Sequence, residues 1–266
     1  MVATKELILQ QTHTTLDKLI KAKADALPKD FNQTKFIQNC MTVLQDAYKI
    51  EECNPLSIAR TMLKGAFLGL DFFMKECYAI PYRGELSFQT DYKGEIKLAK
   101  KYSINPIKDI YAKLVREGDL FEEEIRNGQQ TVNFKPKSFN NNPIVGAFAV
   151  CLFQDNSMIY ETMSTEEIEK IKENFSQKSF KTNDYSKAWK ETPGEMYKKT
   201  VLRRLCKLIQ LDFESIEQKK VFDEASGMEF KQENKPIEKS NFEINEIVEV
   251  DYQEVKEGEQ IEVGQE

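Results

Sequence analysis

The sequence is poor in the side chains that most metal centres and hydrolytic enzymes use. Its 266 residues include one histidine, His13, which stands in a polar N-terminal stretch. A single histidine argues against histidine-based metal centres and against Ser-His or Cys-His catalysis. The five cysteines are widely spaced and form no C-x-x-C pair: Cys40, Cys53, Cys77, Cys151 and Cys206. We therefore expect no disulfide scaffold, no zinc site and a reducing, cytoplasmic environment.

Long apolar runs and nucleotide-binding motifs are also missing. No stretch approaches the ~20 apolar residues of a membrane span, and the opening MVATKELILQQTHTTLDKL lacks the apolar core of a signal peptide. The sequence has no G-x-x-x-x-G-K-[ST] motif, which leaves a RecA-like ATPase unsupported, and no G-x-G-x-x-G after a predicted strand. We expect no membrane contact, no cofactor and no bound metal.

The formal charge of −6 averages two unlike regions. Residues 214–266 hold 16 of the 44 acidic and 6 of the 38 basic residues, which leaves 28 acidic and 32 basic ones in residues 1–213. The body is therefore basic, at about +4, and the tail is acidic, at about −10. A basic body is compatible with a polyanionic partner despite the net negative charge.

The N-terminal part of the chain is predicted to be helical. Residues 5–25 are weakly amphipathic, and residues 31–50 carry apolar side chains at helical spacing. Asn54-Pro55 then predicts a helix start, and Gly69 predicts the end of that helix.

The spacing of the hydrophobic residues changes after this helix. Residues 77–82 and 85–90 flank Arg83-Gly84 and predict a short hairpin, which a helix over 91–102 follows. Residues 107–163 are predicted to be a β-meander with turns at Asn127-Gly128 and Asp155-Asn156.

Ser164 opens a capping box for a helix that reaches about residue 174. The polar residues 175–194 predict a loop, and residues 195–211 predict an amphipathic helix. This order predicts an α+β fold, with a domain over residues 1–213 and an acidic, disordered or partner-binding tail over residues 214–266.

Two predicted helices carry basic residues on one face. The first has Lys93, Lys97, Lys100 and Lys101, and the second has Lys199, Arg203, Lys207 and Arg204. Like charges four residues apart repel by a few tenths of a kcal/mol, so a helix selected only for stability usually intersperses acids. The pattern favours an anionic ligand, while solvated faces with carboxylate partners elsewhere in the fold remain an alternative.

Lysine suits phosphate groups better than base edges, which favours sequence-independent, salt-sensitive binding to a nucleic-acid backbone. Nearby aromatic residues could stack on bases, although core packing is the favoured explanation for each of them taken singly. Trp189, in the predicted polar loop, is the best candidate for stacking. The others are Tyr92, Tyr102, Phe180, Tyr185 and Tyr197.

Two stretches resemble the phage RecT/Redβ family, and the RecT branch in particular. The first contains Leu68-Gly69-Leu70, Ala79-Ile80-Pro81-Tyr82 and Gln89-Thr90-Asp91-Tyr92-Lys93-Gly94. Asp91 departs from the glycine that the family pattern has before the tyrosine. The second contains Trp189 and the run from Glu195 to Leu205, EMYKKTVLRRL. The resemblance covers roughly residues 27–211.

The resemblance implies an ATP-independent protein that binds single-stranded DNA, anneals complementary strands and holds the annealed duplex. It also implies a homo-oligomer, in the form of a ring or helical filament, an exonuclease partner and contact with single-strand-binding protein. The DNA-contacting residues that we expect are Arg83, Gln89, Tyr92, Lys93, Lys97, Lys101, Lys178, Lys181, Lys187, Trp189, Lys198, Lys199, Arg203, Arg204 and Lys207.

Two other function classes stay open. Asp91 followed by Glu95-Ile96-Lys97 is similar to the acidic core of metal-dependent nucleases, although both acids fall in one predicted helix. The second alternative is a protein-interaction scaffold with incidental basic faces. We expect annealing without covalent catalysis, so the protein would not be an enzyme.

Overall fold

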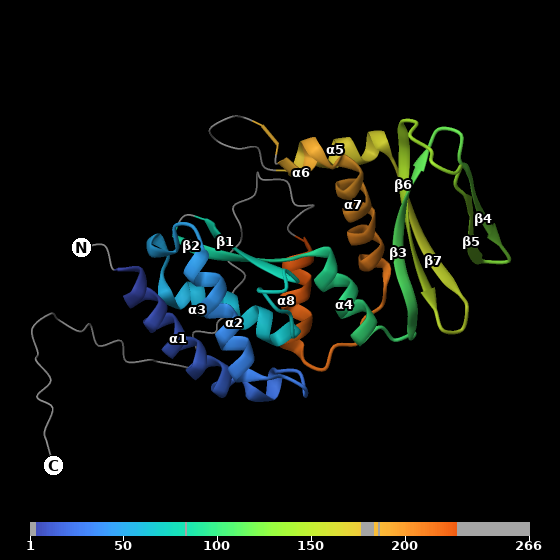
Figure 1. Ribbon diagram of the computed structural model, residues 1–266. Coiled ribbons are helices and arrows are strands. Elements are labelled where there is room, and N and C mark those ends of the chain that lie inside the picture. Colours follow the sequence, from blue (N-terminus) through green and yellow to red (C-terminus); the bar gives the residue numbers. More distant parts are fainter. Residues whose placement is uncertain (1–3, 83, 177–183, 186, 228–266) are drawn as a thin grey trace, which may run out of the picture. The chain divides into compact units, whose positions relative to one another are not determined.

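The computed structural model describes residues 4–82, 84–176, 184–185 and 187–227 (Figure 1). These residues belong to one compact unit, Met1–Lys231, and residues 232–266 form a second unit that lies outside the described part. Helices and antiparallel strands alternate in blocks, which confirms the α+β class. Among the described residues, none of the helices has the length and apolar character that crossing a bilayer requires.

Three N-terminal helices begin at the caps that their sequences supply. They are α1 (Lys5–Ala22), α2 (Gln33–Asp46) and α3 (Pro55–Leu68), with short 3₁₀ turns at Ala24–Ala26 and Ile50–Glu52. Thr4, Asn32 and Asn54 each accept a backbone hydrogen bond at a helix start. Gly69 ends α3 with φ of 63°, a left-handed conformation that glycine adopts without steric cost. The cap at Asn54 and the stop at Gly69 are confirmed.

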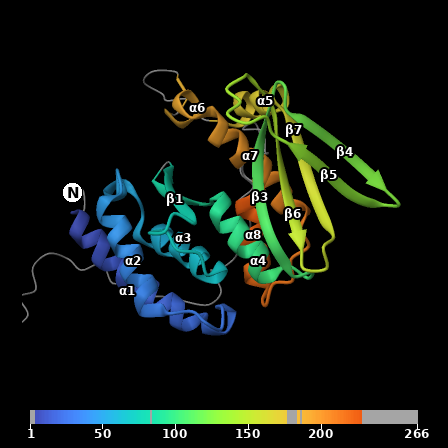
Figure 2. The same cartoon turned by 45° about the vertical axis from the view of Figure 1, so that its right-hand side comes forward.

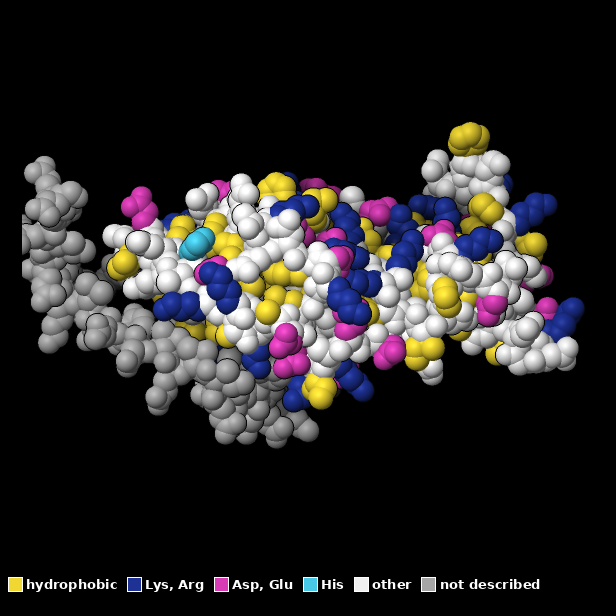
Figure 3. Space-filling view, turned by 90° about the horizontal axis from the view of Figure 1, so that it is seen from below, with side chains coloured by type: hydrophobic (Ala, Val, Ile, Leu, Met, Phe, Trp, Pro, Cys, Tyr) yellow, Lys and Arg dark blue, Asp and Glu magenta, His cyan; other side chains and the backbone are white. Residues whose placement is uncertain are grey.

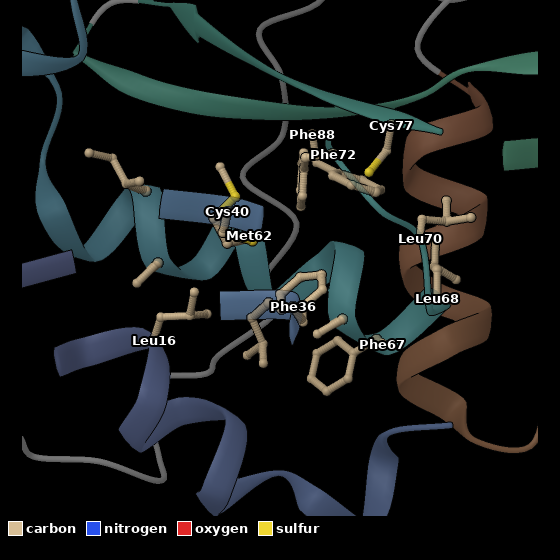
Figure 4. Packing of buried hydrophobic residues seen from close by; sticks show 14 of the residues in the cluster. Leu16, Phe36, Cys40, Met62, Phe67, Leu68, Leu70, Phe72, Cys77 and Phe88 are labelled. Carbon is tan, nitrogen blue, oxygen red and sulfur yellow. The ribbon is translucent and has the colours of Figure 1, made fainter. Parts of the chain in front are cut away.

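The predicted hairpin is confirmed and lies against these helices. Strands β1 (Cys77–Tyr82) and β2 (Glu85–Thr90) pair antiparallel, with Tyr78 opposite Gln89. One face of the hairpin packs on α3, and Leu86 and Phe88 join its core. Figure 4 shows this core, where Phe36 of α2, Met62 and Phe67 of α3 and Phe88 of β2 converge.

The central sheet differs from the predicted meander. Its antiparallel order is β3 (Ile107–Arg116), β6 (Ile144–Phe153), β7 (Met158–Ser164). Strands β4 (Leu120–Arg126) and β5 (Gln129–Lys135) form a separate two-stranded ladder. Asn127 and Gly128 both have positive φ, which confirms the tight turn between them. The turn could be predicted from two adjacent residues, but the pairing of β3 with β6 depends on long-range packing.

Strand β6 separates two layers because its side chains alternate between the two faces of the sheet. Ala147, Ala149 and Cys151 face the helices, while Phe148 and Val150 face the β4–β5 ladder. The helices on the first face include α4 (Tyr92–Tyr102) and α7 (Pro193–Leu208). Figure 2 shows the ladder beside β7.

The predicted loop over 175–194 contains helical residues. Helix α5 (Thr165–Phe175) begins with the predicted capping box, and residues 187–191 form the short helix α6 (Lys187–Glu191). Residues 177–183 and 186 lie outside the described part. Trp189 explains the difference, since its buried ring packs against Tyr197 of α7 and so anchors the short helix.

The acidic tail begins later than the sequence suggested. Residues 216–227 form α8 (Ile216–Gly227), which packs against α3 and β2. Val221 and Ala225 are buried there, and Lys64 Nζ lies 2.7 Å from Glu224 Oε1. The helix was missed because two apolar anchors among charged residues make a weak sequence pattern.

Candidate nucleic-acid interface

Two ion pairs join α4 and α7, the helices that carry the basic residues. Lys199 Nζ lies 3.1 Å from Asp91 Oδ2, and Arg203 Nη2 lies 2.9 Å from Glu95 Oε1. Both acids and both bases are four residues apart, so each helix offers one partner per turn. The numbering rises together on the two helices, which therefore run in the same direction where they meet. Sequence segments about a hundred positions apart are thus brought together.

The inner pair is buried. The side chains of Glu95 and Arg203 are 1% and 2% exposed, and Thr90 Oγ1 donates a hydrogen bond of 2.9 Å to Glu95 Oε1. The expectation that Arg203 lies on the surface and contacts phosphate is therefore wrong. Its guanidinium is committed to a carboxylate from another helix, a partner that the spacing within 195–211 could not reveal. Arg203 is a structural residue that positions α7 against α4.

The outer pair is more accessible. Lys199 is 27% exposed at its side chain, whereas Asp91 is 5% exposed and also accepts from the backbone N–H of Lys93. Asp91 thereby caps α4. Its departure from the family glycine has a physical role here, since aspartate is a strong helix cap and supplies the carboxylate for Lys199.

The other cations of α4 face solvent. Lys93 is exposed and forms no ion pair within the residues that the structure describes. Lys97 Nζ lies 2.7 Å from Glu76 Oε2 and donates to the carbonyl of Gly69. Lys101 Nζ lies 2.8 Å from Asp30 Oδ1. That hydrogen bond holds the pKa of Asp30 below its usual value, so the carboxylate stays charged.

The remaining cations of α7 lie on its accessible sides. Lys198 pairs with Glu195 on the same helix at 2.7 Å. Arg204 pairs with Glu161 of β7 at 2.8 Å, and burial raises the pKa of that glutamate despite the arginine beside it. Lys207 is exposed. We call the accessible cations of the two helices the α4–α7 surface: Lys93, Lys97, Lys100, Lys101, Lys198, Lys199, Arg204 and Lys207.

Acidic side chains accompany most of this surface. Figure 3 shows Lys and Arg interleaved with Asp and Glu on the face seen from below. Taken one residue at a time, these carboxylate partners therefore agree with the alternative that the basic residues form solvated faces. Exposed ion pairs contribute only about 0–1 kcal/mol, so the exposed partners Asp30 and Glu195 compete weakly with a polyanion. The carboxylates of Glu76, Asp91 and Glu161 are less accessible, at 5–18% exposed.

The structure adds two apolar side chains that sequence reasoning missed. Tyr78 and Ile80 lie on the outward face of β1 and are 39% and 44% exposed. Burial raises the pKa of Tyr78, and the carboxylate of Asp91 beside it raises it further. Tyr78 is therefore next to the residue that binds Lys199. The alternation in residues 77–82 could have indicated this face.

The other expected contact residues fall in different surroundings. Gln89, opposite Tyr78, and Tyr92 are half-buried. Lys187 is exposed and lies 3.7 Å from Glu191. Arg83, Lys178 and Lys181 lie outside the described residues.

Trp189 does not fit the expectation of an exposed stacking residue. It is 8% exposed, packs against Tyr197, and has Lys172 Nζ at 5.3 Å from its ring. A buried indole has no free face for a base, so this expectation is wrong for the described conformation.

The acids of the nuclease-like string have other partners. Asp91 caps α4 and binds Lys199, and Glu95 is buried with Arg203. Asp91 is the N-cap of α4 and Glu95 lies in its first turn, so both belong to one local segment, as the sequence suggested. The described part of the chain contains no group of three or more metal-ligating side chains.

Comparison with known proteins identifies the family of this chain. A sequence model described as the RecT family matches residues 34–238, which include both helices of the α4–α7 surface. The chain is also 25% identical over 174 residues to the uncharacterized protein YqaK of Bacillus subtilis (strain 168). That match covers 64% of this chain and 57% of the length of YqaK. Because the family match extends over most of the sequence, this chain belongs to the RecT family.

Proposed function

We propose that this protein binds single-stranded DNA and anneals it to a complementary strand without nucleotide hydrolysis, in recombination of the phage type. Membership of the RecT family supports single-strand annealing as the general role. The observation that carries the proposal is the pairing of α4 with α7, which gathers two basic helices from distant parts of the chain. No covalent step is required of the protein.

Phosphate groups would bind along the α4–α7 surface. Lys93 is available directly, and Lys101 would exchange the exposed carboxylate of Asp30 for a phosphate. Lys97 and Arg204 would exchange the half-buried carboxylates of Glu76 and Glu161. Binding releases the counterions that surround DNA, a gain that exposed ion pairs of about 0–1 kcal/mol do not outweigh. Arg83, Lys178, Lys181 and Lys187 remain predicted contacts.

Bases would contact the outward face of the β1–β2 hairpin. Tyr78, Ile80 and Gln89 lie together there, beside the Asp91–Lys199 pair. An aromatic face accepts any base, which suits binding that is independent of sequence. Phosphates held on one side leave the pairing edges of the bases open to an incoming strand, and annealing is accelerated by positioning and by charge neutralisation.

The resemblance also supports a homo-oligomer on DNA, an exonuclease partner and contact with single-strand-binding protein. Neighbouring copies would extend the basic surface along the strand. The acidic residues that follow α8 are candidates for partner contacts, or for a segment that competes with DNA for the basic surface.

An annealing assay tests the proposal. Complementary oligonucleotides that carry a fluorescent donor and acceptor are mixed with the protein in the absence of ATP and at several salt concentrations. We expect the second-order rate to rise well above the spontaneous rate and to fall as salt increases. An unchanged rate together with salt-independent or absent binding would support the scaffold reading instead.

The same samples distinguish annealing from the alternative of a metal-dependent nuclease. Labelled oligonucleotide is incubated with protein and magnesium and then analysed by length. Intact label supports annealing without cleavage. Shortening that depends on magnesium and is lost in Glu95→Gln would replace the proposal with a nuclease, although the Arg203 pairing argues against a free Glu95.

A further inference from the structure

The loop between β5 and β6 presents one aromatic side chain entirely to solvent. Phe139 is 99% exposed and has φ of 52°, in the left-handed region that bulky residues rarely adopt. Burying a phenylalanine side chain is favourable, so a rigid conformation that displays one needs an explanation. Backbone strain of this kind, when observed, points to function.

The loop is held firmly rather than left free. Asp119 accepts hydrogen bonds from the backbone N–H of Arg116 and Lys137 and from Asn140 Nδ2, all at 2.8–2.9 Å. Asn142 Nδ2 donates to the carbonyl of Glu117 at 2.9 Å, and Arg116 Nη1 donates to the carbonyl of Asn142. The hydrogen bond from Asn140 and those from the two backbone amides lower the pKa of Asp119, so the network is intact at neutral pH. A hydrogen-bonded loop thus holds the ring of Phe139 in solvent.

A cavity lies at the other end of the same strands. It has a volume of about 560 Å³ and lies between the β4–β5 turn and the β6–β7 turn. Its lining is mostly polar and includes Gln129, Gln130 and Asp155, with Phe153, Met158 and Ile159 as the apolar side chains. An apolar cavity of about 150 Å³ already accommodates benzene, so a phenylalanine ring fits here.

The aromatic loop and the cavity cannot meet within one molecule. The loop precedes the first residue of β6, Ile144, and the cavity borders its last residue, Phe153. Ten residues of strand separate the two ends by about 30 Å at 3.3 Å per residue. Figure 1 shows the β6–β7 turn at the end of β6 that lies away from the β5–β6 loop.

Charge also matches between the two ends. Lys135 and Lys137 precede Phe139 by four and two residues and are exposed. At the cavity, Asp155 accepts hydrogen bonds from the hydroxyl and the backbone N–H of Ser157, which lower its pKa and keep it negative. The lysines near the ring are complementary in charge to the carboxylate at the cavity.

We propose that Phe139 of one copy of this protein inserts into the cavity at Gln129, Phe153 and Met158 of a second copy. The contact joins different surfaces of the two copies, so it leaves a free loop at one end and a free cavity at the other. Repetition of such a contact produces a ring or an open filament rather than a closed dimer. The inference assigns an interface to the proposed homo-oligomer and rests on that part of the proposed function.

Association is measured by sedimentation velocity over a range of protein concentrations, with and without a long oligo-dT. Phe139→Asn removes the ring and retains the left-handed conformation, which asparagine tolerates. Gln129→Trp fills the cavity from a position whose side chain is exposed. Tyr48→Ala, which removes another exposed aromatic ring, is the matched control. We expect association about tenfold weaker in the first two variants, as for the loss of an aromatic anchor, and wild-type behaviour in the control.

A mixture of the two interface variants gives a sharper result. Phe139→Asn retains an open cavity and Gln129→Trp retains the ring, so together they form one productive contact. The mixture should therefore yield dimers that neither variant forms alone. Wild-type association in both variants, or a mixture that behaves as the average of its parts, would overturn the interface. A wild-type protein that stays monomeric under all conditions would also overturn it.

Binding to an oligo-dT too short for two copies separates this inference from the proposed function. We expect Phe139→Asn to bind it like the wild type. A loss of short-strand binding in Phe139→Asn would show that the ring contacts DNA and would refute the interface. Absence of short-strand binding in the wild type, with association still dependent on Phe139, would instead refute the DNA-binding proposal and leave the interface standing.

Discussion

Glu95 and Arg203 form a buried ion pair, 2.9 Å apart, at the contact between α4 and α7. Each side chain is at most 2% exposed, so neither charge is stabilised by bulk water. Each must therefore be stabilised by the other and by its polar neighbours, such as Thr90. The pair makes the relative position of the two basic helices depend on two specific residues.

Removal of one partner of this pair should destabilise the protein strongly. Glu95→Ala leaves an uncompensated guanidinium in the interior, at a cost of about 3–5 kcal/mol. The double variant Glu95→Leu/Arg203→Met replaces both charges with apolar groups of similar length, and we expect it to be closer to the wild type than either single variant. Urea denaturation gives the free energies of unfolding. Additive effects of the two substitutions would show that the side chains do not act as a pair.

Removal of one exposed lysine should weaken DNA binding without changing stability. Lys93→Ala deletes a cation that makes no ion pair in the described part of the chain, so it should lower the slope of log affinity against log salt by about 0.7 for single-stranded DNA. Lys18→Ala, on the exposed side of α1, is the matched control and should leave the slope unchanged. Equal slopes for Lys93→Ala and Lys18→Ala would remove Lys93 from the interface.

Two truncations should separate α8 from the residues that follow it. A chain that ends after residue 227 retains the buried Val221 and Ala225, so we expect wild-type thermal stability. A chain that ends after residue 213 exposes the apolar surface under α8 and loses the Lys64–Glu224 pair, which should lower the melting temperature by several degrees. Equal melting temperatures for the two truncations would contradict the packing of α8 on α3. DNA affinity of the longer truncation then reports on the acidic residues alone.

Tyr197 should make stability depend on alkaline pH. Burial and the hydrogen bond that its hydroxyl donates to Glu169 raise the pKa of Tyr197 to about 12. The folded state therefore keeps this proton after the unfolded state loses it near pH 10, so stability falls between pH 10 and 12. Denaturation midpoints across this range, compared with those of Tyr197→Phe, isolate the effect from other titrating groups. The difference between the two proteins should shrink as pH rises, and a constant difference would contradict this assignment.

Local signals predicted the elements that depend on neighbouring residues. Asn54-Pro55 and Gly69 delimit α3 because a side-chain cap and a left-handed glycine act within one helical turn. Ser164 and Glu167 bind each other's backbone across three residues, and Asn127-Gly128 forms a turn by itself. The family resemblance and the basic spacing of α4 and α7 were likewise visible in the sequence.

Tertiary structure decided which of these features face solvent and which face each other. The spacing of Lys199, Arg203 and Lys207 places them on one side of a helix, but only the contact with α4 buries Arg203 against Glu95. The polar residues around Trp189 predict a loop, yet Tyr197 supplies a surface that buries the indole. Strand β3 pairs with β6 rather than with β4, because strand pairing also depends on long-range packing. Caps and turns depend on energies within a few residues, whereas burial and pairing depend on partners that the chain brings together only when it folds.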